Sequence, residues 1–186
     1  MNIGLGITGS FCTHDKALTL AKELVEVGYN VFPIVTNIVV NTDTRFGKAS
    51  DFLKKLKEIT KNEVITSITQ AEPLGPKGLI DAIVIAPCTG NTLSKLARAV
   101  TDNAVTMTAK SLMRNNKPVV VGVATNDGLG LSFENIAKLA NTKNFYIVPF
   151  FQDDPENKPK SLMVKWEQIE KTLKLAIQGK QIQPLF

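Results

Sequence analysis

Small polar residues gather where the first apolar run of the chain ends. Residues 8–13 follow that run and precede an amphipathic segment typical of a helix. Gly9 lets the backbone approach an anion closely, Ser10 and Thr13 offer hydroxyl donors, and the helix start adds free N–H groups with a favourable dipole. This pattern predicts a short phosphate-binding loop. The alternative is a turn in which Thr13 only caps the helix.

Two more polar segments are predicted at the same edge of a sheet. Thr36 ends the apolar run that begins at Val31, and a hydroxyl there is compatible with a monophosphate, which a carboxylate would repel. Asn91 and Thr92 follow the run 82–86 and offer donors before a helix, unless they merely cap it. In a doubly wound sheet these strand ends meet at the topological switch point, where ligands bind.

A dinucleotide site is not expected on this chain. Gly4, Gly6 and Gly9 match the pattern G-x-G-x-x-G, but the first two fall inside a predicted strand, whereas the fingerprint must follow one. The second strand ends at Thr36 and Asn37, with no carboxylate to hold ribose hydroxyls.

Four other side chains near these loops belong to residue types that can do chemistry. His14 titrates near neutral pH and is a candidate proton donor or phosphate contact, or else a local hydrogen-bonding residue. Arg98 follows the Asn-Thr loop and suits a carboxylate bidentately, although a helix surface is its default place. Cys12 and Cys88 lack C-x-x-C spacing, so we expect them to be free thiols rather than a redox pair.

The elements that position these residues alternate between continuous apolar runs and helical periods. Six strands are predicted at 3–8, 31–36, 64–66, 82–86, 119–124 and 145–148, with helices at 15–27, 49–59, 92–100, 104–115 and 133–141. Continuous apolar strands are buried on both faces, which predicts a three-layer, doubly wound, mainly parallel α/β sheet. We expect one domain over 1–186, in which a polar linker, 151–160, leads to a C-terminal helix at 161–178 that covers the core.

Composition narrows the class of protein. At 186 residues the chain can bury a core without metals or disulfides, and it has no His/Cys spacing typical of a metal site. Its net charge of +5 comes from lysines dispersed among acidic residues, not from a basic stripe, so nucleic acid is not an expected partner. No apolar run has membrane-spanning length and no signal peptide is evident, so we expect a cytoplasmic protein.

These motifs together resemble a known superfamily. Gly9-Ser10, Thr36, and the series Pro87-x-x-x-Asn91-Thr92-x-x-Lys95-x-Ala97 with Asp102 are similar to the homo-oligomeric flavin-containing cysteine decarboxylases, a flavoprotein superfamily, over about residues 1–150. The resemblance implies a flavoprotein-like fold, bound FMN and a homo-oligomer with flavin at subunit contacts. It also implies the cofactor residues, with phosphate at Gly9, Ser10, Phe11 and Thr36 and the flavin near Cys88, Asn91 and Thr92.

A closer resemblance is to the B-subunit family of dipicolinate synthase. It rests on the stretches 85–92, 125–130 and 148–155 and extends to the C-terminus. It implies a separate NADP-binding A subunit, together with which dihydrodipicolinate, a small dicarboxylate, is oxidised to dipicolinate during sporulation. An FMN that relays a hydride between substrate and nicotinamide is our own hypothesis.

The sequence also departs from the superfamily's decarboxylases. Their active-site histidine has no counterpart in residues 73–76, and their Pro-x-Met-Asn substrate clamp is replaced by residues 123–126, where only Asn126 is kept. Asn126 is therefore a candidate carboxylate contact, while decarboxylation is disfavoured. Two alternatives to the oxidoreductase subunit stay open: an FMN-dependent decarboxylase, and a non-catalytic scaffold subunit with a relic anion site.

Overall fold

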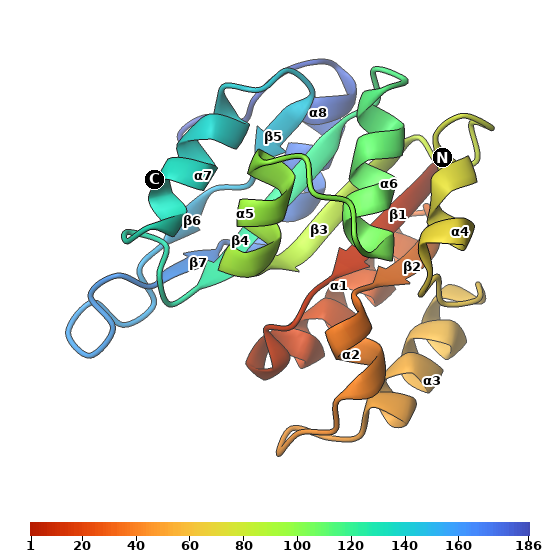
Figure 1. Cartoon of the computed structure of the whole chain (residues 1–186), viewed down its shortest axis with the longest axis horizontal. Helices are drawn as coiled ribbons and strands as arrows, with labels where there is room; N and C mark the ends of the chain where they lie inside the picture. The colour runs from red at the N-terminus through yellow and green to blue at the C-terminus, as the bar shows by residue number, and fades with distance from the viewer.

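One sheet with helices on both faces organises the chain (Figure 1). The computed structural model describes all of residues 1–186. The strands run in the order β2-β1-β3-β4-β7-β6, and β5 pairs with β4. Their bounds are β1 (Asn2–Ile7), β2 (Asn30–Val35), β3 (Ala82–Cys88), β4 (Val119–Thr125), β5 (Phe145–Ile147), β6 (Phe150–Phe151) and β7 (Leu162–Val164). β1 to β5 pair in parallel, whereas β7 is antiparallel to both β4 and β6.

The helices are α1 (His14–Glu26), α2 (Asn37–Asn41), α3 (Ala49–Thr60), α4 (Ile68–Ala71), α5 (Gly90–Ala97), α6 (Ala104–Met113), α7 (Ser132–Ala140) and α8 (Ile169–Ile177). Five of the predicted helices, α1, α3, α5, α6 and α7, are present with shifts at their ends, while the short helices α2 and α4 were not predicted. Three 3-10 turns are η1 (Phe11–Thr13), η2 (Glu72–Leu74) and η3 (Trp166–Gln168). None of the helices has the length and apolar character needed to cross a membrane.

Alternate residues of the strands divide the core into two layers. Ile3 and Leu5 of β1 pack with α1, α3 and α8 on one face. Ile83 and Ile85 of β3 pack with α5, α6 and α7 on the other face. Because β1 and β3 are neighbours while β2 and β4 lie outside them, the chain winds outward in both directions from the centre. The predicted three-layer, doubly wound and mainly parallel sheet is confirmed, with seven strands rather than six.

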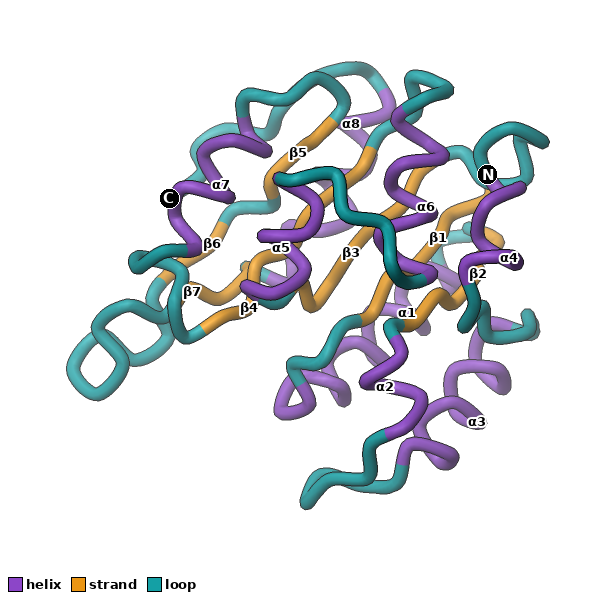
Figure 2. The backbone as a smooth tube through the Cα atoms, viewed as in Figure 1, coloured by secondary structure: helices purple, strands orange, loops and turns teal.

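Two predicted elements are wrong. The segment 64–66 is not a strand of the sheet, because only Ile65 forms a bridge, to Ile34 of β2. The C-terminal helix does not span 161–178: Leu162–Val164 form β7, and α8 begins at Ile169. Residues 151–160 are consequently not a linker to a helix. Apart from Phe151, which ends β6, they are a loop between β6 and β7 that projects from the end of the sheet (Figure 2).

The burial pattern of residues 162–164 shows why this segment is a strand and not part of the predicted C-terminal helix. Leu162 and Val164 are buried while Met163 between them is half-buried, which is the two-residue alternation of a strand. Leu162 and Met163 pair with Thr125 and Ala124 of β4, so the pairing depends on a contact distant in sequence.

Candidate functional site

A polar cavity of about 400 Å³ opens where β1, β2 and β3 end. This is the switch point of the doubly wound sheet, at which such folds bind ligands. The cavity therefore brings together the predicted residues Gly9, Thr36, Asn91 and Thr92, which are far apart in the sequence. Six further residues line it, namely Asn37, Ile38, Thr89, Lys95, Asp102 and Asn103.

The loop between β1 and α1 presents backbone donors without partners. The N–H groups of Gly9, Phe11 and Cys12 donate to no acceptor in the protein. Thr13 does not cap α1, since its Oγ1 donates to the carbonyl of Ser10 at 2.8 Å. Thr13 therefore stands at the N-cap position without a side-chain capping bond, and the loop keeps backbone donors of the kind that an anion needs.

Neighbouring contacts hold this loop in place. Thr8 Oγ1 donates to the carbonyl of Pro87 at 2.7 Å and accepts the N–H of Thr89 at 3.1 Å, which ties the ends of β1 and β3 together. A Cβ at Gly9 would lie 3.0 Å from Ile38 Cγ2, so a side chain there would press on the segment after β2.

Thr36 contributes a hydroxyl that has no partner. The residue is 7% exposed, and its Oγ1 is the only buried side-chain hydroxyl in the chain without a hydrogen bond. Thr36 also stands at the N-cap of α2 without capping it. An unsatisfied buried hydroxyl is costly, and because Thr36 lines the cavity, a ligand that reached this hydroxyl would satisfy it.

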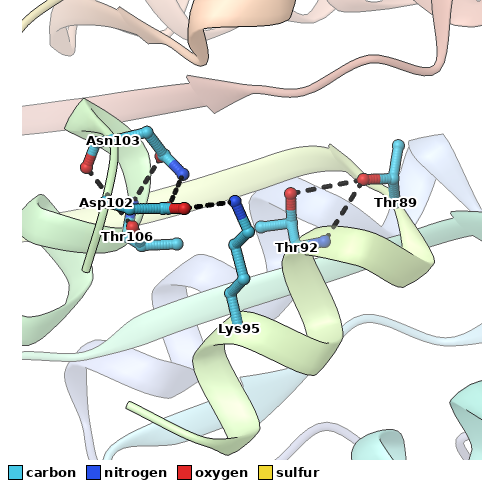
Figure 3. A network of polar contacts seen from close by, with 6 residues as sticks. All are labelled: Thr89, Thr92, Lys95, Asp102, Asn103 and Thr106. Atoms are coloured by element: carbon cyan, nitrogen blue, oxygen red, sulfur yellow. Dashed lines mark hydrogen bonds and ion pairs between the residues drawn. The ribbon is translucent and has the colours of Figure 1, made fainter. Parts of the chain in front are cut away.

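A polar network forms the opposite wall of the cavity (Figure 3). Thr89 caps α5, because its Oγ1 accepts the N–H of Thr92 at 3.4 Å. Asn103 caps α6 through the N–H of Thr106 at 3.1 Å. Asn91 makes no side-chain hydrogen bond, so neither it nor Thr92 is the cap that the alternative supposed, and Asn91 is free for a ligand.

An ion pair within this network joins α5 to the segment before α6. Lys95 Nζ lies 2.6 Å from Asp102 Oδ2, and Asn103 Nδ2 donates to Asp102 Oδ1 at 2.9 Å. The hydrogen bond from Lys95 holds the pKa of Asp102 below its usual value. The one carboxylate that lines the cavity is thus neutralised by a lysine.

Other predicted residues lie outside the cavity. Phe11 and His14 line a smaller cavity between α1 and α3, where the His14 ring stacks on Phe52 at 4.3 Å. His14 Nε2 lies 3.1 Å from the Thr8 carbonyl, and burial lowers the pKa of its ring. Its position fits the local hydrogen-bonding alternative. Ser10 is half-buried in the loop and does not line the cavity.

The two cysteines have different surroundings. Cys88 is fully buried, and burial raises the pKa of its thiol, so its side chain is not available at the cavity. Cys12 is exposed. Both are free thiols, as the spacing predicted.

Of the two remaining candidates, only Arg98 lies at a second polar cavity, of about 600 Å³, which shares Thr89 and Asn91 with the first. Arg98 lines it and donates to Asn135 Oδ1 at 2.8 Å and to Ser94 Oγ at 3.0 Å. Asn126 is exposed and does not line this cavity.

Sequence reasoning missed some of the cavity lining. Asn37, Ile38 and Asn103 carry no motif of their own, and Thr89 enters only within the stretch 85–92 that carries the family resemblance. A cap signal was present for Thr89, which precedes α5, and for Asn103, which precedes α6.

Known proteins share this fold and much of this sequence. A family model described as flavoprotein matches residues 1–178. The B subunit of dipicolinate synthase from Bacillus subtilis (strain 168) is 48% identical over 183 residues, which are 98% of this chain and 92% of that protein. The crystal structure of the dipicolinate synthase B subunit from Bacillus halodurans matches with a TM-score of 0.90 and 48% identity, over 99% of this chain and 94% of that one.

A solved structure with lower sequence identity has the same fold. The crystal structure of the FMN-dependent cysteine decarboxylase SpaF has a TM-score of 0.70 at 19% identity, over 95% of this chain and 97% of that one. This likeness concerns the fold alone. The family model and the 48% identity establish that the chain belongs to the flavoprotein family and, within it, to the B-subunit family of dipicolinate synthase.

Proposed function

We propose that this member of the flavoprotein family binds FMN in the polar cavity at the ends of β1, β2 and β3. The observation that carries the proposal is the unpartnered hydroxyl of Thr36, which lines the cavity that also reaches Gly9 of the donor loop. The unpartnered N–H groups of Gly9, Phe11 and Cys12 add donors that suit a phosphate dianion. Asp102 does not oppose the anion, since Lys95 neutralises it.

Two loops of the chain would contact different parts of the cofactor. The β1–α1 loop, with Ser10 and Thr36, would hold the phosphate. Asn91, with its free amide, and Thr92 would face the flavin from the β3–α5 loop. The ion pair between Lys95 and Asp102 joins the last turn of α5 to the segment just before α6 along this wall. When bound, FMN supplies hydride acceptance and donation, while the protein orients the cofactor and its reaction partners.

We further propose that the chain acts as the B subunit of a dipicolinate synthase, with a separate A subunit that binds NADP. The support is the name of the Bacillus subtilis relative, a synthase subunit, at 48% identity. The chain itself offers no dinucleotide loop, because Gly4 and Gly6 lie inside β1. A Cβ at Gly4 would lie 3.0 Å from Ile34, so that glycine serves packing within the sheet. The small dicarboxylate substrate would enter beside the flavin, where the second polar cavity adjoins the first.

An FMN titration of the purified chain tests the cofactor site. Flavin fluorescence and absorbance would be followed for FMN and for riboflavin, which lacks the phosphate. We expect FMN to bind at least about tenfold more tightly, because charge-assisted hydrogen bonds to phosphate exceed neutral ones.

The variant Ser10→Asp places a carboxylate in the loop and should remove this preference, whereas Ser10→Ala should largely keep it. Equal affinity for FMN and riboflavin, or an unchanged preference in Ser10→Asp, would refute the phosphate loop. If FMN does not bind even with the A subunit present, the non-catalytic scaffold is the better interpretation. If FMN binds and Asn91→Ala abolishes synthase activity in an intact complex, the flavin takes part in the reaction.

A further inference from the structure

A further, mostly apolar cavity lies among α5, α6 and α7. Its volume is about 290 Å³. The floor is formed by Leu96, Ala109, Met113, Leu139 and Phe145, of which Ala109 and Leu139 are each 1% exposed. A cavity of this size falls at the lower limit of small-molecule sites, so it suits a molecule with one ring rather than a nucleotide.

Three cationic side chains surround this apolar floor. Lys110 and Arg114 come from α6 and the residue that caps its end, one helical turn apart, and Lys138 comes from α7. None of the three takes part in an ion pair, and no carboxylate lines the cavity. Glu134, one turn before Lys138 on α7, lines the second polar cavity instead.

This charge arrangement costs the fold some stability. Like charges four residues apart on a helix repel by a few tenths of a kcal/mol, and here no acidic neighbour offsets them. Uncompensated cations around an apolar floor are complementary to a molecule with an apolar body and a negative charge.

We propose that this cavity binds a small aromatic carboxylate. The ring lies against the apolar floor, where Phe145 and the Met113 sulfur suit an aromatic partner. The carboxylate group or groups face Lys110, Arg114 and Lys138, and Arg114 is able to hold one of them bidentately.

The apolar cavity and the proposed FMN cavity lie on opposite sides of one segment. Lys95, Asp102 and Asn103 line the polar cavity, while Leu96 and Thr101 from the same part of the chain line the apolar one. The aromatic carboxylate is therefore separate from the proposed FMN, and its binding does not depend on the proposed function.

Ligand titration of the full chain without added flavin tests the site. The probes are isophthalate with two carboxylates, benzoate with one, and benzyl alcohol with none. Methyl NMR signals of Leu96, Met113 and Leu139 report on the floor of the cavity. We expect the affinity to fall in the order isophthalate, benzoate, benzyl alcohol, with shifts concentrated at these methyl groups.

Variants that remove a positive charge show whether the cavity recognises the carboxylate group or only binds apolar rings. Arg114→Gln and Lys138→Gln alter exposed side chains and should each weaken isophthalate binding roughly two- to fivefold, as expected for exposed ion pairs. Lys143→Gln, an exposed lysine outside the cavity, is the matched control and should leave binding unchanged. Equal binding of benzyl alcohol, no binding of isophthalate up to about 10 mM, or insensitivity to both variants would overturn the proposal. So would self-association of the chain, measured by sedimentation, that Arg114→Gln or Lys138→Gln disrupts, because a second copy would then cover the cavity.

Discussion

Replacing Thr36 by valine should separate stability from cofactor binding. The substitution removes one hydroxyl and keeps the shape of the side chain. In the folded protein that hydroxyl is buried and has no partner, so its loss should stabilise the chain without FMN by about 1 kcal/mol. The N-cap position loses nothing, because Thr36 makes no capping bond.

The same change should weaken FMN binding. A hydrogen bond to a charged group contributes about 1.5–3 kcal/mol, so the dissociation constant should rise roughly 10- to 100-fold. Urea unfolding of the protein without FMN gives the first quantity, and fluorescence titration with FMN gives the second. At saturating FMN the order of stability should reverse, since the wild type gains more from the ligand.

A matched threonine provides the control. Thr60 is 5% exposed, lies in α3 away from the cavity, and donates to the Leu56 carbonyl at 2.8 Å. Thr60→Val should lower stability and leave FMN affinity unchanged, because it removes a satisfied hydroxyl. If Thr36→Val destabilises the protein without FMN as Thr60→Val does, or binds FMN with wild-type affinity, Thr36 is not a phosphate donor.

Three further predictions follow from local features. Ala99 lies just past the end of α5 with φ at 58°, a conformation that favours glycine, so Ala99→Gly should raise the free energy of unfolding by about 1 kcal/mol. Ala97→Gly, inside α5, should lower the free energy of unfolding by about the same amount. Urea unfolding of both variants measures the two changes. Burial lowers the pKa of His14 from 6.5, so the contribution of His14 to stability is complete above pH 6.5 and is lost as the pH falls through the lower folded pKa. The free energy of unfolding, measured at intervals between about pH 5 and 7, should show this decline in the wild type. An equal decline in His14→Gln would contradict the prediction. Iodoacetamide should alkylate exposed Cys12 and spare buried Cys88 in the native protein, as measured by mass spectrometry. If Cys88 is modified first, β3 opens locally.

The strands that the sequence predicted correctly share one property. Val119–Thr125 and its parallel neighbours are apolar almost throughout because both faces of the sheet are covered, so the pattern is visible in the sequence. β7 has no such pattern. Leu162, Trp166 and Ile169 are spaced as on a helix, and the strand is fixed by pairing with β4, where Val164 also fills the space beside Gly122.

The candidate site, like the fold, is predictable from the sequence only in part. Gly9, Thr36 and Asn91 could be predicted because each follows a strand, and strand ends meet at one edge of a parallel sheet. The direction of a side chain is harder to predict: Cys88 ends β3 at the same edge, yet its side chain lies in the core and is fully buried. The pair between Lys95 and Asp102 depends on how the chain turns between α5 and α6, and no local pattern specifies that turn.

The outer edge of β2 is closed by groups that are not strands. Ile65 donates to the Pro33 carbonyl at 2.8 Å and accepts from Val35 at 3.0 Å, while the Asn62 side chain donates to the Val31 carbonyl at 2.8 Å. Pro33 itself has no N–H to offer. At the other end the sheet stops at β5, whose Ile147 exchanges hydrogen bonds with the Gln181 side chain, and at β6, which is only two residues long. With both edges blunted, the sheet resists growth by strand addition, the route by which exposed edges aggregate or exchange between chains. We therefore expect assembly of this protein with copies of itself or with another chain to use its helices and loops.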